Sequence, residues 1–413
     1  MTARLLYRRS SWPASSIAEI SADRALRLYG LVLALTVTLT GWYWLRGPLP
    51  LSDILGPSTP PICWPFWDRC GDFHGFPEST IRSAIWMFTV LGIVDAWLFV
   101  TRFVRGAYWI LAFLTCVKVA VILLDYRLVL NHHMMTGWVT LVFLFVSRKR
   151  IALMTMLCAF YVWAGALKLT PDADWLSGAA LHGARPFHLP AALVPVACSY
   201  VVLLELVAVW GLLSRSAPVF WLSYAQFLVF HLASFWVVGW FYPLLMFLLL
   251  SILVLIRFLP AGHVNPLKQP SKMSRDAVAV LAVFCAAQLV PAVIPGRAAF
   301  TGEGRIFALN MFDGPPLDCR AVLVRRSSGA VSETIRLRIL YLNARLTCDP
   351  IVFRSATLGY CSAEQNPDID LIVDARKRGA PDYHRLIDVA SFCSVRPGYR
   401  LLWRNYWIRL PAG

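Results

Sequence analysis

The sequence FYVWAGALKLTPDADWLSG, residues 160–178, combines an apolar helix, a lysine in its last turn and a polar turn that follows directly. The lysine is Lys168, and the turn is Pro-Asp-Ala-Asp-Trp at 171–175. A lysine at the end of a membrane helix can extend to the lipid headgroups, or it can take up and release a proton at the edge of an apolar bundle. Both alternatives predict a membrane helix bundle with Lys168 at its outer edge.

The composition indicates a polytopic membrane protein. Hydrophobic residues make up 58% of the 413 residues and charged residues only 15%, whereas about 25% of residues are charged in soluble proteins. The net charge of +16 fits basic residues gathered on the cytoplasmic side of a membrane. Membrane lipid with acidic headgroups is therefore the expected partner of this charge, and nucleic acid is not.

Apolar runs of about 20 residues span a bilayer as helices, and the chain has nine candidates, of which the fourth is short. They cover residues 28–46, 83–101, 107–125, 134–147, 151–168, 192–213, 219–239, 243–258 and 276–295. The basic residues between these runs fall on the same side as the N-terminus. They are Arg102, Arg105, Arg148, Lys149, Arg150, Arg215, Lys268, Lys272 and Arg275.

These basic residues predict the orientation. The positive-inside rule makes their side cytoplasmic, so residues 47–82, 126–133, 169–191 and 296–413 are expected outside. The basic segment 1–27 precedes an apolar run that is long for a signal peptide, and we predict an uncleaved first span with the N-terminus inside. A bacterial inner membrane, with the C-terminal region in the periplasm, is the expected location.

The ten cysteines agree with this topology. Six fall in the segments predicted to be outside, and the other four lie within apolar runs. The outside cysteines are Cys63, Cys70, Cys319, Cys348, Cys361 and Cys393. An even number in an oxidising compartment predicts disulfides, with Cys63 and Cys70 as the local pair and three possible pairings among the other four. Zinc is the rival interpretation, but the spacing lacks a Cys-x-x-Cys pair, and no metal is predicted.

The region after the last apolar run has a different pattern. Alternating stretches at 321–324, 334–341 and 368–373 predict strands, and residues 380–395 are compatible with a helix. The complete prediction is an all-α polytopic membrane helix bundle with about nine transmembrane helices, at 28–295. A small α+β extracytoplasmic domain at 296–413 follows the bundle.

Five ionisable residues fall within the predicted spans, where such groups are costly and usually face the bundle interior or a cavity. They are Asp95, Lys118, Lys168, Glu205 and His231. A structural interpretation pairs Lys118 with Asp95 or Glu205. Lys168 and His231 are expected in the outer half, near His132 and His133.

The run YVWAGALKLTPDADWLSG resembles the lysine motif of the vitamin K-dependent γ-carboxylases and their bacterial relatives, the horizontally transferred transmembrane (HTTM) proteins. The matching positions are Ala164, Gly165, Lys168, Leu169, Asp174, Trp175 and Gly178. Two weaker matches follow the family order: LLDYRLVLNHHMMTG at 123–137 and SYAQFLVFHLASFWVVGWFYP at 223–243. The resemblance covers roughly residues 28–260.

The resemblance implies an enzyme that couples oxygenation of reduced vitamin K, a hydroquinone, to carboxylation of glutamyl groups, with O2 and CO2 as co-substrates. It assigns Lys168 as the base that deprotonates the hydroquinone, and removal from water favours the free amine that this role needs. It links His133, or His132 if the register differs by one, to the carboxylation step. The residues expected to bind the quinone are His231, Trp163, Phe230, Trp236, Asp174 and Trp175.

The chain also departs from the family. Thr170 and Pro171 lengthen the turn before Asp172, and the C-terminal region is much smaller than the lumenal region with which the animal enzyme binds a propeptide. The expected acceptor is an extracytoplasmic peptide or protein that contains Glu. The alternative is a membrane protein of the same fold that does not carboxylate: it binds a quinone or lipid and presents its outer domain to a partner.

Overall fold

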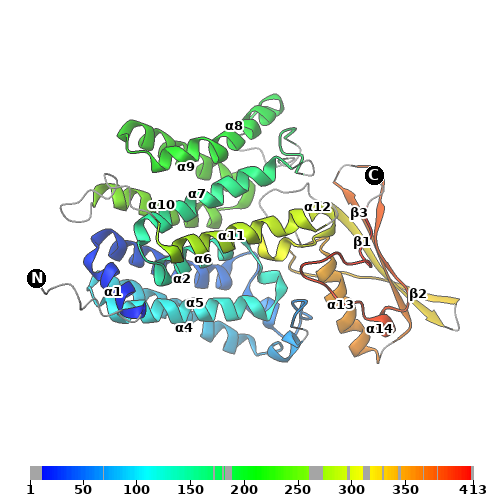
Figure 1. Cartoon of the computed structure of the whole chain (residues 1–413). Helices are drawn as coiled ribbons and strands as arrows, with labels where there is room; N and C mark the ends of the chain where they lie inside the picture. Colours follow the sequence, from blue (N-terminus) through cyan, green and yellow to red (C-terminus); the bar gives the residue numbers. More distant parts are fainter. Residues whose placement is uncertain are drawn as a thin grey trace, which may run out of the picture.

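The computed structural model has two parts, a helix bundle and a small domain with a β-sheet at one end of it (Figure 1). We call this end of the bundle the domain end. The structure describes residues 12–67, 69–170, 173–178, 181, 188–259, 273–294, 298–309, 317–327, 330–342, 346–365, 367–378 and 380–410. The expectations for Pro171, Asp172, Lys268 and Lys272 lie outside these residues.

The helices of the bundle run roughly parallel or antiparallel to one another (Figure 1). They are α1 (Trp12–Ala22), α2 (Arg24–Arg46), α3 (Leu51–Leu55), α4 (Glu78–Val100), α5 (Val104–Leu124), α6 (Asn131–Phe145), α7 (Lys149–Lys168), α8 (Val194–Leu206), α9 (Ala217–Val238), α10 (Phe241–Phe258) and α11 (Arg275–Val293). Short 3-10 helices are η1 (Cys70–Phe73), η2 (Tyr126–Leu128), η5 (Ala191–Leu193) and η6 (Ala208–Leu213).

Within the described residues, eight helical segments are long and apolar enough to cross a membrane, and η5, α8 and η6 together count as one of them. The predicted multi-pass helical bundle is confirmed. The fourth predicted span is the exception to the expected nine, because α6 has only 15 residues, fewer than the roughly 20 that a bilayer requires.

The outward faces of the helices are apolar. Met87, Trp97 and Leu222 are each more than 60% exposed, and a large exposed apolar surface of this kind requires a non-aqueous environment. Small residues bring α2 and α4 into close contact: a Cβ at Gly41 would lie 2.2 Å from Thr89 Oγ1. Close approach at small residues is typical of helices packed in membranes.

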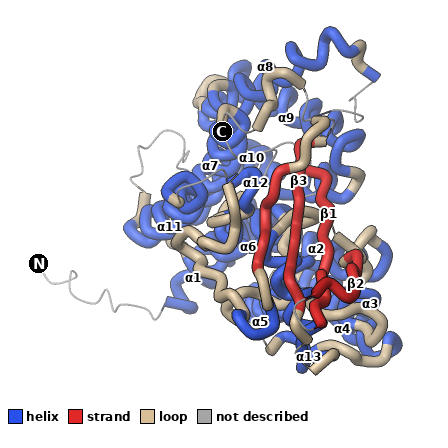
Figure 2. The backbone as a smooth tube through the Cα atoms, turned by 90° about the vertical axis from the view of Figure 1, so that its right-hand side faces the viewer, coloured by secondary structure: helices blue, strands red, loops and turns tan. Residues whose placement is uncertain are grey.

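The C-terminal domain contains an antiparallel sheet in the order β2-β1-β3-β4 (Figure 2). Its elements are α12 (Ala298–Thr301), η7 (Arg305–Phe307), β1 (Leu317–Ser327), β2 (Ala330–Arg336), α13 (Pro350–Ala363), β3 (Ile369–Lys377), β4 (His384–Val389) and α14 (Phe392–Val395). The predicted α+β class is confirmed. The helix expected over 380–395 is wrong: residues 384–389 pair with β3, and only 392–395 are helical, because pairing along the sheet edge outweighs local helix preference.

The disulfides resolve the pairing that the sequence left open. Cys63 pairs with Cys70, as expected for the local pair. Cys319 pairs with Cys348, and Cys361 with Cys393. The four cysteines of the apolar runs, Cys116, Cys158, Cys198 and Cys285, are free thiols.

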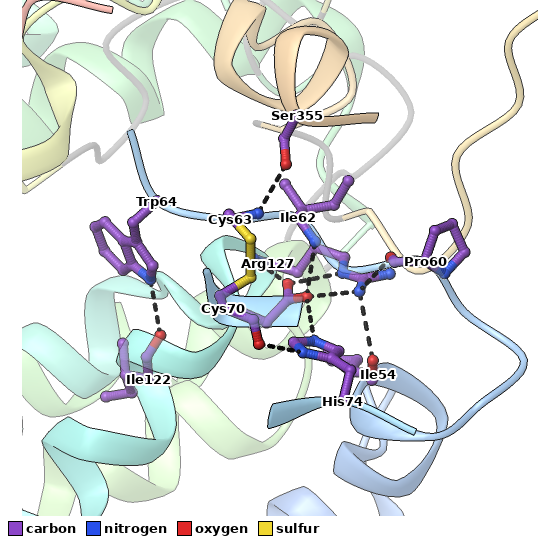
Figure 3. Close-up of polar contacts among 11 residues, drawn as sticks. Ile54, Pro60, Ile62, Cys63, Trp64, Cys70, His74, Ile122, Arg127 and Ser355 are labelled. Carbon is purple, nitrogen blue, oxygen red and sulfur yellow. Dashed lines mark hydrogen bonds and ion pairs between the residues drawn. A yellow bond between two sulfur atoms is a disulfide. The ribbon is translucent and has the colours of Figure 1, made fainter. Parts of the chain in front are cut away.

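A buried polar cluster joins the first disulfide loop to the end of α5 (Figure 3). The Asp125 carboxylate accepts hydrogen bonds from Arg127 Nη2 at 2.6 Å, from the Ile62 backbone N–H at 3.1 Å and from His74 Nε2 at 3.1 Å. Burial alone raises the pKa of Asp125, but the hydrogen bonds from Arg127 and His74 and the charge of Arg127 lower this pKa below its ordinary value overall. Cys63 N–H donates to Ser355 Oγ of α13 at 2.8 Å, which attaches the C-terminal domain to this loop.

Candidate functional site: a buried lysine–glutamate pair

Lys168, in the last turn of α7, forms an ion pair with Glu205 of α8. Its Nζ lies 2.6 Å from Glu205 Oε2 and 2.8 Å from Oε1, and both side chains are about 1% exposed. Nζ also donates to the Ala164 carbonyl oxygen at 3.3 Å. Lys168 therefore points into the bundle, so the alternative in which it extends to the headgroups is wrong.

Gly165 explains how α7 and α8 come close enough to form this pair. A Cβ at position 165 would lie 2.9 Å from Leu206 Cγ and 3.0 Å from Glu205 Cβ. Any larger side chain would push α8 outward. The glycine of the Ala-Gly-x-x-Lys pattern thus forms a helix–helix contact one turn before Lys168. This contact brings Glu205 within reach of the lysine.

An aromatic ring covers the ammonium group. The Trp175 ring centroid lies 5.1 Å from Lys168 Nζ, within the range of a cation–π interaction. Trp175 Nε1 donates to the Cys198 carbonyl oxygen of α8 at 2.9 Å, which fixes the ring. Gly178 closes the turn with a φ of +80°, and a Cβ there would meet Val194 Cγ1 at 2.8 Å. Asp174 instead accepts a hydrogen bond from Ser177 Oγ at 2.9 Å within the turn.

A second polar pair lies two turns earlier on α7. Tyr161 Oη and His231 Nε2 of α9 are 2.6 Å apart, and both residues are buried. Aromatic rings surround His231: Phe230 at 4.9 Å and Tyr242 at 5.8 Å between centroids. His231 Nδ1 has no hydrogen-bond partner within the described part of the chain.

His132 and His133 lie in the first turn of α6, with ring centroids 4.3 Å apart. The Tyr43 ring is 5.1 Å from His132, and the Trp44 ring is 5.8 Å from His133. Among the described residues, neither nitrogen of His133 has a hydrogen-bond partner. The two histidines thus form a buried group with free hydrogen-bonding capacity.

The first turn of α10 separates this histidine pair from His231. Phe241 lies 4.8 Å from the His132 ring, and the next residue, Tyr242, lies 5.8 Å from the His231 ring. The structure therefore brings His132, His133 and His231 to one region of the bundle, but not into direct contact.

The pairing expected for Lys118 is wrong. Lys118 Nζ donates to Thr136 Oγ1 at 2.5 Å, and Thr136 lies one turn after His132 on α6. Glu205 instead forms its ion pair with Lys168. Neither oxygen of the buried Asp95 carboxyl has a hydrogen-bond partner in the described residues. The sequence did not identify Lys168 as the partner of Glu205. Their contact depends on how α7 and α8 pack together, which the sequence alone does not show.

Trp163, Phe230 and Trp236, three of the residues expected to bind the quinone, have different neighbours. Trp163 Nε1 donates to Cys285 Sγ of α11 at 3.4 Å, Phe230 packs on His231, and Trp236 is 39% exposed beside Phe235. Over the described ranges, no three His, Cys, Asp or Glu residues gather in a group that could hold a metal ion.

Comparison of the chain with protein-family models, with curated proteins and with solved structures finds no match. Lys168, Glu205 and the buried histidines are therefore the residues from which a function can be inferred.

Proposed function

We propose that this chain is an integral membrane enzyme that resembles the vitamin K-dependent γ-carboxylases and uses reduced vitamin K to carboxylate glutamyl groups. In balanced form, hydroquinone and O2 give quinone epoxide and water, while a glutamyl γ-C–H and CO2 give a new carboxylate and a proton. The quinone supplies the oxygen chemistry. The protein's residues hold and move the protons.

The Lys168–Glu205 pair carries this proposal. A lysine and a carboxylate 2.6 Å apart and buried from water hold a transferable proton, because low polarity brings the neutral and charged forms of such a pair close in energy. When that proton rests on Glu205, Lys168 Nζ has the lone pair with which to accept a proton from a hydroquinone. Glu205 is thus assigned as the proton acceptor behind Lys168.

The histidines supply the other proton-handling groups. Tyr161 orients His231 through their hydrogen bond. His132 and His133 have ring nitrogens to offer to a substrate, because the described residues leave them without partners. The carboxylation step is assigned to this histidine pair.

Chemistry at the two ends of the bundle supports the proposed orientation. The three disulfides, in the first loop and the C-terminal domain, fit an oxidising compartment. Arg148, Lys149 and Arg150 lie together at the start of α7, where Arg150 pairs with Asp23 near the N-terminus, and basic residues favour the cytoplasm. We assign the domain end to the extracytoplasmic side, with Lys168 near it.

To test this proposal, purified protein in detergent is incubated with reduced vitamin K, O2, labelled bicarbonate and a short glutamyl peptide, and label in the peptide and quinone epoxide are measured. We expect label in the peptide and quinone epoxide in equal amounts. Lys149→Met is the matched control, since Lys149 is a second fully buried lysine, at the opposite end, and it should retain activity. Absence of label from a folded protein would contradict carboxylation.

A second candidate function is favoured by the same ion pair. If Glu205 holds Lys168 permanently as an ammonium ion, the site binds a quinone or lipid without turnover, and the C-terminal domain serves a partner. In that case neither epoxide nor label forms, although a quinone still raises the thermal unfolding temperature of the protein.

A further inference from the structure

The loop at 399–407, near the C-terminus, is held firmly against the start of the C-terminal domain. The Asn405 backbone N–H and Nδ2 donate to Glu303 Oε1 at 2.5 and 3.0 Å. Asn405 Oδ1 accepts from the Arg400 N–H at 2.6 Å, which closes the loop on itself. Asn405 is 2% exposed, so this anchor is part of the folded core.

The hydrogen bonds between Asn405 and Glu303 hold the loop at the same depth as the ends of the spanning helices. Gly304, next to Glu303, packs on the last turn of α11: a Cβ there would lie 3.0 Å from the Pro291 Cα and 2.9 Å from Ile294 Cδ1. Leu401 packs in the cluster that contains Tyr126, two residues after α5 ends. In Figure 1 the red C-terminal chain passes beside α12, on the side of the domain that meets the helices.

Large apolar side chains project from this loop. Leu402 is 57% exposed, Trp403 72% and Tyr406 82%. The Arg400 guanidinium lies 6.0 Å from the centroid of the Tyr406 ring, and Arg404 lies between the two aromatic residues in the sequence. Three such side chains on one short loop are costly in water, whereas Trp and Tyr are enriched where membranes meet water.

We propose that this loop inserts Leu402, Trp403 and Tyr406 into the headgroup region of the leaflet at the domain end. The exposed Arg400 then meets lipid phosphates, for which a guanidinium is well suited. The contact holds the C-terminal domain against the bilayer surface. This inference does not depend on the proposed enzymatic activity.

Three features favour lipid over a protein partner. The loop lies at the level of the helix ends, where a bilayer surface must be. It combines Trp, Tyr and Arg, as interfacial segments do. The last turn of α11, on which Gly304 packs, also exposes an apolar side chain, since Val293 is 75% exposed.

The test places a nitroxide spin label at position 403 or 406, by Trp403→Cys or Tyr406→Cys in a background with Cys116→Ala. Val395→Cys is the matched control, because Val395 is 60% exposed on α14 of the same domain. The labelled proteins are reconstituted in nanodiscs that contain anionic lipid. Electron paramagnetic resonance then compares access of apolar O2 and of a polar nickel complex to each label.

We expect labels at 403 and 406 to favour O2 over the nickel complex by several fold, and the label at 395 to show the reverse. Equal nickel access at 403 and 395 would overturn the proposal. Low access of both reagents at 403 would also overturn it, since that result means burial against protein. The single variants Leu402→Asp and Trp403→Asp provide a second measurement, because each should increase nickel access at 406 if lipid is the partner.

Discussion

Lys168 and Glu205 are 37 positions apart in the chain and meet at 2.6 Å inside the bundle. Each would be costly in hydrocarbon alone, and together with the Trp175 ring they form a satisfied group. The sequence identified Lys168 as a candidate site residue and Trp175 as part of the same motif, but not their contact. It could not predict Glu205 as the partner, because Lys118 offered an equally plausible charge and only helix docking decides between them.

Replacing Glu205 tests its assigned role. We expect Glu205→Gln to keep the fold, since the amide can still accept a hydrogen bond from Lys168, and to lower kcat for epoxide formation by about 10²-fold, the scale of general-base effects. KM for the hydroquinone should change little. Glu19→Gln, at the opposite end of the bundle, is the control with unchanged kcat. A Glu205→Gln enzyme with normal kcat would remove Glu205 from the proton path.

Substitutions at Lys168 and Glu205 should also have coupled effects on the stability of the protein. Lys168→Ala alone leaves an uncompensated buried carboxylate, at a cost of about 3–5 kcal/mol. Adding Glu205→Gln should recover a large part of this loss. Thermal unfolding in detergent of the two single variants and the double variant measures the coupling, and additive losses would mean that the two charges do not interact.

The contact between α7 and α8 depends on Gly165. Gly165→Ala should separate the helices, because the new Cβ would lie within 3.0 Å of both Glu205 and Leu206, and we expect lower thermal stability together with lower activity. Gly137→Ala on α6 is the matched control, since nothing lies within 4 Å of its Cβ position, and alanine favours the helix. Equal effects at the two glycines would contradict this account of the contact.

Asp349, the N-cap residue of α13, should make the stability of the protein depend on pH. Burial raises the pKa of Asp349 from 3.8 to about 6, although hydrogen bonds from Ile351 N–H and Tyr126 and the charge of Arg305 lower it in part. The folded protein holds this proton more tightly than the unfolded chain does. Protonation of Asp349 therefore stabilises the folded state at low pH, and this stabilisation is lost as pH rises from about 4 to 6. The loss amounts to about 3 kcal/mol.

Asp349→Asn should remove this loss. Asparagine still caps the helix and does not ionise, so the thermal unfolding temperature of the variant should fall less between pH 4 and 7 than that of the wild type. Parallel curves for the two proteins would show that Asp349 ionises normally.

Helices and strands differed in how well the sequence predicted them. The long apolar runs identified the spanning helices, because burial in lipid requires a continuous apolar stretch. The segment 380–395 was misassigned, because the partner that makes 384–389 a strand is β3, a separate stretch of sequence. The cysteine pairing among Cys319, Cys348, Cys361 and Cys393 depends on the same sheet and was likewise open.

The bundle and the C-terminal domain share buried contacts rather than a flexible link. The hydrogen bond from Cys63 to Ser355 and the bond from Tyr126 Oη to Asp349 Oδ2 at 3.0 Å cross the junction. The cluster around Asp125 holds the first loop and the end of α5 together on the bundle side of this junction. The domain is therefore positioned over the end of the bundle nearest to Lys168. An acceptor peptide at the surface would meet both parts of the molecule.

The central claim is that the Lys168–Glu205 pair serves as the base for a hydroquinone. The most direct measurement is epoxide formation from reduced vitamin K by the wild type and by the Lys168→Ala, Glu205→Gln double variant, which is expected to remain folded. The account predicts epoxide from the wild type and a loss of at least about 10²-fold in the double variant. Epoxide formation at the same rate by both folded proteins would contradict it.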